Sequence, residues 1–181
     1  MYPFRYRFEF DHDEGINAIK AMLEIQGYPL YSETWSDQPP IFTMLLKLWF
    51  QIFGQTVLAG RVLVMLISAG LLWLVIQYLR QFFGNLHALI AAALLLLLPY
   101  YLRLSVSIMI GLPAIAFALL SFFGIAQWHR KSSSIWLLLS AAALGLSIMT
   151  KLFTAFLAPI FFTGIVLSSL ISYREHKDVK R

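Results

Sequence analysis

Two short polar elements precede a long series of apolar segments, and both carry carboxylates. The first spans residues 11–15 and contains Asp13 and Glu14, and the second spans residues 36–40 and contains Asp37. Because the apolar segments that follow are long enough to enter a membrane, these carboxylates are expected at the boundary between lipid and water. Acidic side chains at the edge of a membrane indicate chemistry there.

His12 stands between two of these carboxylates, so the question of a metal site arises. Helical zinc sites commonly use two histidines four residues apart, and no second histidine stands at that distance from His12. The chain contains no cysteine, which removes a disulfide framework and a thiolate metal site. We therefore predict no metal ligand among these residues.

Composition places the chain among integral membrane proteins. Of its 181 residues, 60% are hydrophobic and 13% are charged, and the mean hydropathy is +0.74. The apolar runs are interrupted only by short polar breaks, which predicts an all-α membrane protein built as a helical bundle. The basic residues behind the net charge of +5 gather in short loops and at the C-terminus, so nucleic acid is not an expected partner.

Five apolar runs are predicted to cross the membrane as helices. Their expected ranges are 62–79, 88–100, 108–128, 135–149 and 152–171. The second and fourth runs are short for a full crossing, so they are expected to tilt or to be shielded by neighbouring helices. The predicted parts of the chain are a loop with two juxtamembrane amphipathic helices at 1–60, a transmembrane helical bundle at 61–172 and a basic tail at 173–181.

The distribution of basic residues predicts the orientation of a multi-pass protein in the cytoplasmic membrane. Arg80 and His87 flank one predicted connection, residues 129–131 fill another, and further basic residues crowd the tail. Because basic residues are retained on the cytoplasmic side, these parts are expected there, and residues 1–60, where acidic residues outnumber basic ones, are expected outside. Those 60 residues include no signal peptide or earlier span that would carry them across. We therefore expect that a first transmembrane helix is missing and that the chain is a fragment.

The first amphipathic helix is expected soon after the acidic cluster. Ile16, Ile19 and Met22 recur at helical spacing, while polar residues occupy the other faces. Asp13 is expected to cap this helix and Gly27 to end it. Such helices lie in the membrane interface.

The second amphipathic helix is expected from Pro39 or Pro40 to Phe53, because proline is tolerated in a first helical turn. Asp37 is positioned to cap this helix, and Gly54 is positioned to end it. Together, the two helices would hold the carboxylates near the boundary between lipid and water.

The order and spacing of these elements resemble the N-terminal part of the C-type membrane glycosyltransferases related to protein O-mannosyltransferases and aminoarabinose transferases. In that family the first outward loop begins with an Asp-Glu pair and runs through a juxtamembrane helix to an acidic-Lys-Pro-Pro element, and a second such helix ends near Phe-Gly. The corresponding residues here are Asp13, Glu14, residues 37–40, residues 53–54, Arg61 and Lys151. Two positions depart from the pattern: Gln38 replaces the usual lysine, and Gly111 stands where a later loop often has an acidic residue. The resemblance covers nearly the whole chain and implies a C-type helical bundle.

The resemblance implies transfer of a sugar, with inversion, from a polyprenyl-phosphate donor to a hydroxyl of a lipid, glycan or protein acceptor outside the cytoplasmic membrane. Such a reaction needs a base to take the acceptor proton; Asp13 is the candidate, and Glu14 or Asp37 can orient the acceptor or Asp13. The residues expected to bind substrate are Asp37, Gln38, Arg61, Arg103 and Lys151. The cations among them can stabilise the departing lipid phosphate. Because phosphate is already a workable leaving group, no nucleotide or redox cofactor is expected.

Each candidate also has a structural interpretation that the sequence leaves open. The two aspartates can be helix caps, and the three basic residues can extend toward lipid head groups. Trp35 and the other tryptophans and tyrosines fit an interfacial belt better than a sugar platform. The alternative function is a non-catalytic membrane protein, such as part of a transporter or an assembly subunit. A transporter would place ionisable groups in the middle of its spans, whereas here polar groups collect outside, which favours chemistry at the surface.

Overall fold

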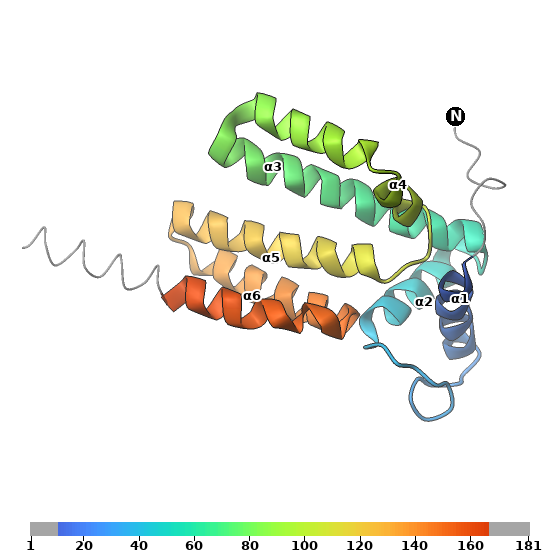
Figure 1. Ribbon diagram of the computed structural model, residues 1–181. Coiled ribbons are helices and arrows are strands. Elements are labelled where there is room, and N and C mark those ends of the chain that lie inside the picture. Colours follow the sequence, from blue (N-terminus) through green and yellow to red (C-terminus); the bar gives the residue numbers. More distant parts are fainter. Residues whose placement is uncertain (1–10, 167–181) are drawn as a thin grey trace, which may run out of the picture.

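The computed structural model describes residues 11–166 of the chain (Figure 1). The extended elements in this part are limited to an isolated bridge between Leu30 and Thr34, and the rest of its regular structure is helical. The predicted all-α fold is therefore confirmed. The predicted basic tail at 173–181 and the end of the 152–171 run lie outside the described residues.

Helix α1, His12–Ile25, starts and ends through local capping. Asp11, and not Asp13 as predicted, caps it: Asp11 has an extended backbone, and its Oδ1 accepts a hydrogen bond from the Asp13 N–H at 3.2 Å. The predicted end at Gly27 is confirmed, since the C-cap is Gln26 and Gly27 follows it with a φ of 97°.

Helix α2, Ile41–Phe53, follows the two prolines and ends at Gly54, whose φ is 91°. The prediction that Asp37 caps α2 is wrong, because the N-cap is Pro40 and no side chain caps this helix. The two helices pack together at one end of the molecule (Figure 1). Their shared core includes Ala21, Phe42 and Leu46, all nearly inaccessible to solvent.

Helix α3, Val57–Leu97, is two helices joined at a reversal. Thr56 caps its start by accepting a hydrogen bond from the Ala59 N–H at 3.1 Å. At Gly84 the backbone leaves the helical region (φ 84°, ψ 176°), and the chain folds back along itself (Figure 1). The predicted runs 62–79 and 88–100 therefore lie on opposite sides of this turn. The short helix α4, Pro99–Ser105, follows.

Helices α5, Gly111–Lys131, and α6, Ser134–Thr150, form a close antiparallel pair. The hydroxyls of Ser121 and Ser140 each donate to the other residue's carbonyl at 2.7 Å. Gly124 allows this approach, because a Cβ there would lie 2.9 Å from the Cβ of Ser140. A 3₁₀ turn, η1, Leu152–Phe156, then leads into the last described helical segment, which packs on α5 through Phe122 and Phe161.

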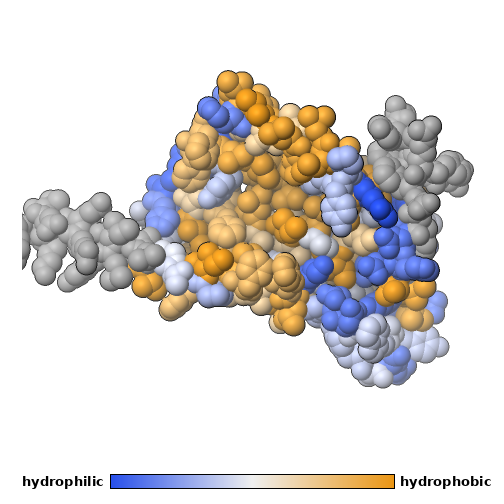
Figure 2. Space-filling view, viewed as in Figure 1, coloured by the Kyte–Doolittle hydropathy of each residue, from blue (hydrophilic) through white to orange (hydrophobic). Residues whose placement is uncertain are grey.

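The surface separates an apolar body from a polar end. Hydrophobic residues cover most of the helical bundle, and hydrophilic ones gather over α1 and the loop after it (Figure 2). In the described part, Val57–Leu97 and Gly111–Lys131 are long and apolar enough to cross a membrane, judged by length and composition. The polar end is where α1 and α2 meet the bundle.

Candidate active site

A cavity of about 460 Å³ opens at the polar end of the molecule. Its wall is formed by α1, the loop between α1 and α2, α4, the segment that enters α5, and Lys151 at the end of α6. The polar residues that line it are Asp11, Asp13, Asn17, Lys20, Asp37, Gln38 and Lys151. Four of the seven site residues expected from the sequence, Asp13, Asp37, Gln38 and Lys151, thus meet around one space.

Asp13 lies in the first turn of α1, with an exposed side chain facing the cavity. An exposed carboxylate on the wall of an open cavity can accept a proton from a bound hydroxyl.

Glu14, the next residue, points away from the cavity into the protein and is 0% exposed. Arg61 meets it with two parallel hydrogen bonds, from Nε to Oε1 at 2.7 Å and from Nη2 to Oε2 at 2.9 Å. Oε1 also accepts the Ile108 N–H at 3.2 Å, and Asn17 Nδ2 donates to the Ile108 carbonyl at 2.9 Å. These contacts fix α1 to α3 and to the segment before α5.

Lys20 connects α1 to the loop that precedes α2. Its side chain is buried, and its Nζ lies 3.0 Å from Asp37 Oδ1 and 3.4 Å from the hydroxyl of Ser36. Asp37 Oδ2 accepts a hydrogen bond from Gln38 Nε2 at 2.8 Å. The hydrogen bond from Gln38 and then the one from Lys20 lower the pKa of the Asp37 carboxyl. Gln38 occupies the position where the resembling family has a lysine. A positive charge is nevertheless present beside Asp37, because Lys20 reaches it from α1.

Arg103 and Arg61 lie outside the cavity wall. Arg103 is on α4, about half exposed, and its Nη2 lies 3.5 Å from Asp11 Oδ2. Arg61 lies behind α1 in the buried pair with Glu14. The structure therefore does not bring these two cations to the cavity together with Lys151.

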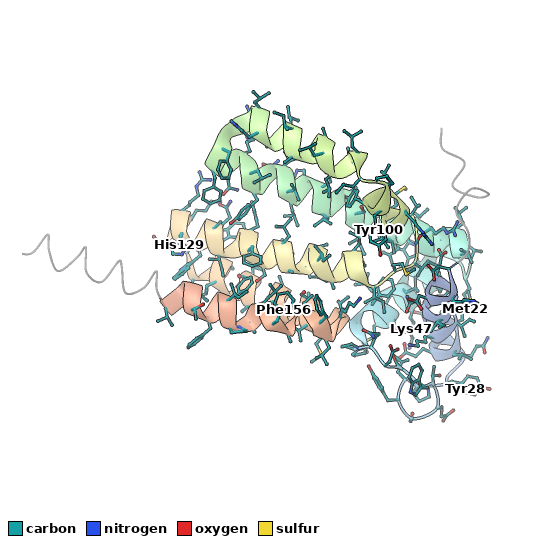
Figure 3. All side chains as sticks on the ribbon, viewed as in Figure 1. Met22, Tyr28, Lys47, Tyr100, His129 and Phe156 are labelled. Atoms are coloured by element: carbon teal, nitrogen blue, oxygen red, sulfur yellow. The ribbon has the colours of Figure 1, made fainter. Side chains whose placement is uncertain are left out.

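An apolar groove, also of about 460 Å³, adjoins the cavity. It runs between α5 and the segment after α6, and its lining residues include Ile115, Phe122, Phe153 and Phe156; Figure 3 labels Phe156 on that segment. Gly111 and Lys151 line both the cavity and the groove. Lys151 therefore stands between a polar space and an apolar one.

Sequence reasoning missed three polar residues of the cavity: Asp11, Asn17 and Lys20. The signal for the latter two was spacing, because residues 13, 17 and 20 lie at intervals of four and three, which places them on one helical face. The apolar periodicity of Ile16 and Ile19 drew attention away from these polar residues; both side chains are about half exposed, and Ile16 itself lines the cavity. Within residues 11–166, no group of three or more histidines and carboxylates is arranged to hold a metal ion.

A protein-family model matches most of the chain. It describes dolichyl-phosphate-mannose-protein mannosyltransferases and matches residues 37–177. The matched part begins at Asp37 and includes α2, the helical bundle and Lys151, whereas Asp13 and Glu14 lie ahead of it. No curated protein and no solved structure matches the chain.

Proposed function

The chain belongs to the dolichyl-phosphate-mannose-protein mannosyltransferase family, and from this membership we propose that its cavity transfers a sugar from a polyprenyl-phosphate donor to an acceptor hydroxyl. The family is one of membrane glycosyltransferases, which agrees with the apolar helical body. The lipid-linked donor, the inverting course and the outward-facing site are parts of the proposal.

The observation that carries the proposal is that Gly111 and Lys151 line both the polar cavity and the apolar groove, so the two spaces are neighbours at Lys151. A polyprenyl-phosphate sugar has a polar head and a long apolar tail, and it needs two adjoining spaces of these two kinds. The groove would take the first isoprene units, because burial of apolar surface is favourable. Lys151 would then meet the phosphate with a charge-assisted hydrogen bond.

The proposed reaction uses Asp13 as its base. The Asp13 carboxylate takes the proton from the acceptor hydroxyl while the oxygen attacks the anomeric carbon of the donor. The bond between that carbon and the phosphate oxygen breaks, so the electron pair leaves with the lipid phosphate. Attack opposite the leaving group inverts the anomeric configuration, and Lys151 stabilises the negative charge on the departing phosphate.

We assign Glu14 and Arg61 to positioning. Both side chains are buried, and their charged groups bind each other. Because Glu14 follows Asp13 on the same helical turn, the pair holds α1 in the orientation that presents Asp13 to the cavity. The residues proposed to contact substrate are therefore Asp13, Asp37, Gln38 and Lys151. Arg103 does not line the cavity, and its part in the proposal is to hold Asp11, which does.

The charge distribution supports an outward-facing site. Figure 3 labels Tyr100 at the end that carries α1 and His129 at the opposite end of the bundle. Arg130 and Lys131 follow His129 in the last turn of α5. Basic residues at the end away from the cavity fit a cytoplasmic face there, with the cavity on the other side of the membrane.

Asp13→Asn in the full chain tests the function, with the protein in native membranes and a radiolabelled polyprenyl-phosphate sugar as donor. We expect loss of transfer with unchanged membrane abundance, since the amide cannot take the proton. His12→Asn is the matched control, because His12 is the exposed neighbour and does not line the cavity. Near-normal turnover of the Asp13→Asn protein contradicts the assignment.

A further inference from the structure

Trp35 lies on the cavity wall and is 75% exposed. From the sequence, Trp35 is predicted to belong to a belt of aromatic residues at the membrane interface. Yet Trp35 shares the wall with Lys20, Asp37 and Gln38, whose charged and amide groups need water or hydrogen-bonding partners. A large apolar ring exposed beside such groups indicates a surface that binds something.

The loop that carries Trp35 is braced by hydrogen bonds among its own residues. Tyr31 has a φ of 71°, which a non-glycine residue adopts only when its surroundings enforce it. Its N–H donates to the Thr34 carbonyl at 2.8 Å, and its hydroxyl donates to the Gln38 carbonyl at 2.7 Å. Thr34 is buried and donates to the Tyr28 carbonyl at 3.1 Å. The loop therefore presents the indole from a fixed backbone.

Polar groups are fixed around the indole in the same way. The Lys20 ammonium lies 5.2 Å from the centre of the Trp35 ring, within the range of a cation–π contact. Asp37 holds that ammonium at 3.0 Å, and Gln38 donates to the other oxygen of Asp37. The result is an exposed aromatic ring on the same cavity wall as a carboxylate and an amide, with Lys20 in contact with both the ring and the carboxylate.

We propose that Trp35, with Asp37 and Gln38, forms a saccharide-binding subsite. A sugar ring has a face of C–H groups that can stack on the negative face of an indole, and hydroxyls at its edge that can bond a carboxylate and an amide. Lys20 is a positioning residue for this subsite. The inference rests on the proposed function and deepens it: the ring that Trp35 takes is either the donor's own sugar or a sugar of a glycan acceptor.

The subsite is tested by binding alone, with the full chain in lipid nanodiscs. Methyl α-mannoside is the probe, sorbitol is the control polyol without a ring, and saturation-transfer NMR is the readout. We expect Trp35→Ala to weaken binding of the mannoside about tenfold, Trp35→Tyr to retain part of it, and sorbitol not to bind. Trp73→Ala is the matched control, because Trp73 is 55% exposed on α3 and does not line the cavity. Equal mannoside binding by the wild type and Trp35→Ala overturns the proposal.

A second measurement tests the belt interpretation. Nanodiscs with brominated acyl chains quench tryptophans that lie in lipid. We expect the wild type and Trp35→Phe to lose the same amount of fluorescence. An additional quenched component in the wild type would place Trp35 in the bilayer and overturn the proposal.

The source of the sugar follows from transfer kinetics in native membranes with radiolabelled polyprenyl-phosphate mannose. A donor KM raised about tenfold in Trp35→Ala assigns the ring to the donor. A lower kcat at unchanged donor KM assigns the ring to the acceptor.

The Asp13→Asn variant separates the catalytic proposal from the subsite proposal. If its transfer stays near normal while Trp35→Ala loses mannoside binding, the catalytic assignment fails and the subsite stands. If Asp13→Asn loses transfer while Trp35→Ala binds normally, the subsite alone fails.

Discussion

Adjacent carboxylates in α1 have opposite environments. Asp13 is exposed at the cavity, whereas Glu14 is fully buried and paired with Arg61. The cause is helical geometry, since successive side chains point about 100° apart around the axis. Two neighbouring acidic residues can therefore take different roles, one toward a substrate and one toward the fold.

At this scale we expect Arg61→Met to destabilise the protein, because it leaves the buried Glu14 charge without its bidentate partner. Removing one partner of a buried ion pair costs about 3–5 kcal/mol. The double variant Glu14→Gln with Arg61→Met should recover a large part of this loss. Thermal unfolding of the full chain in detergent measures both. If Arg61→Met lost turnover at unchanged stability, Arg61 would instead belong to the substrate contacts.

A soluble amphipathic helix is expected to bury its apolar side chains and expose its polar ones, and helix α1 departs from this at several positions. It buries Glu14, Asn17 and Lys20, and it leaves Ile16 and Ile19 about half exposed. These three side chains have partners on α3, at Ile108 and in the loop before α2, respectively. The exposed Ile19 fits a helix beside lipid, whereas Ile16 lines the cavity together with the polar residues of this helix.

At the scale of elements, the contact between α5 and α6 depends on a small residue. We expect Gly124→Leu to push the helices apart and to lower the free energy of unfolding by about 1–3 kcal/mol, because any side chain at this position would clash with Ser140. The matched control is Gly145→Leu, since a Cβ at Gly145 in α6 has open space around it. Thermal unfolding in detergent compares the two. Equal stability of the two variants would show that the helices do not need this approach.

The described part of the molecule has a polar end that carries the cavity and an apolar body beside it (Figure 2). The reversal at Gly84 and the turn between α5 and α6 both lie at the other end (Figure 1). This arrangement separates the candidate site from the basic connections by the length of the bundle. A lipid-linked substrate could thus enter from the membrane while its head group reaches water.

Orientation in the membrane is testable at this scale because the chain contains no cysteine. Ser32→Cys marks the exposed loop near the cavity, and Asn85→Cys marks the exposed turn beside Gly84. In intact cells, we expect a membrane-impermeant thiol reagent to modify Ser32→Cys and to leave Asn85→Cys unmodified until the membrane is opened. The reverse pattern would place the cavity in the cytoplasm and contradict the proposed sidedness.

The sequence by itself determined the membrane class, the helical fold, the ends of α1 and α2 at Gly27 and Gly54, and the family resemblance. Composition and glycine conformation act locally, so they can be read from a single chain. Only the tertiary structure decided which polar residues meet. Asp37 turned from the expected cap into the partner of Lys20, and Arg61 turned from a candidate phosphate ligand into the buried partner of Glu14. These contacts join residues 17 and 47 positions apart, and their geometry depends on how α1 packs against the loop and α3.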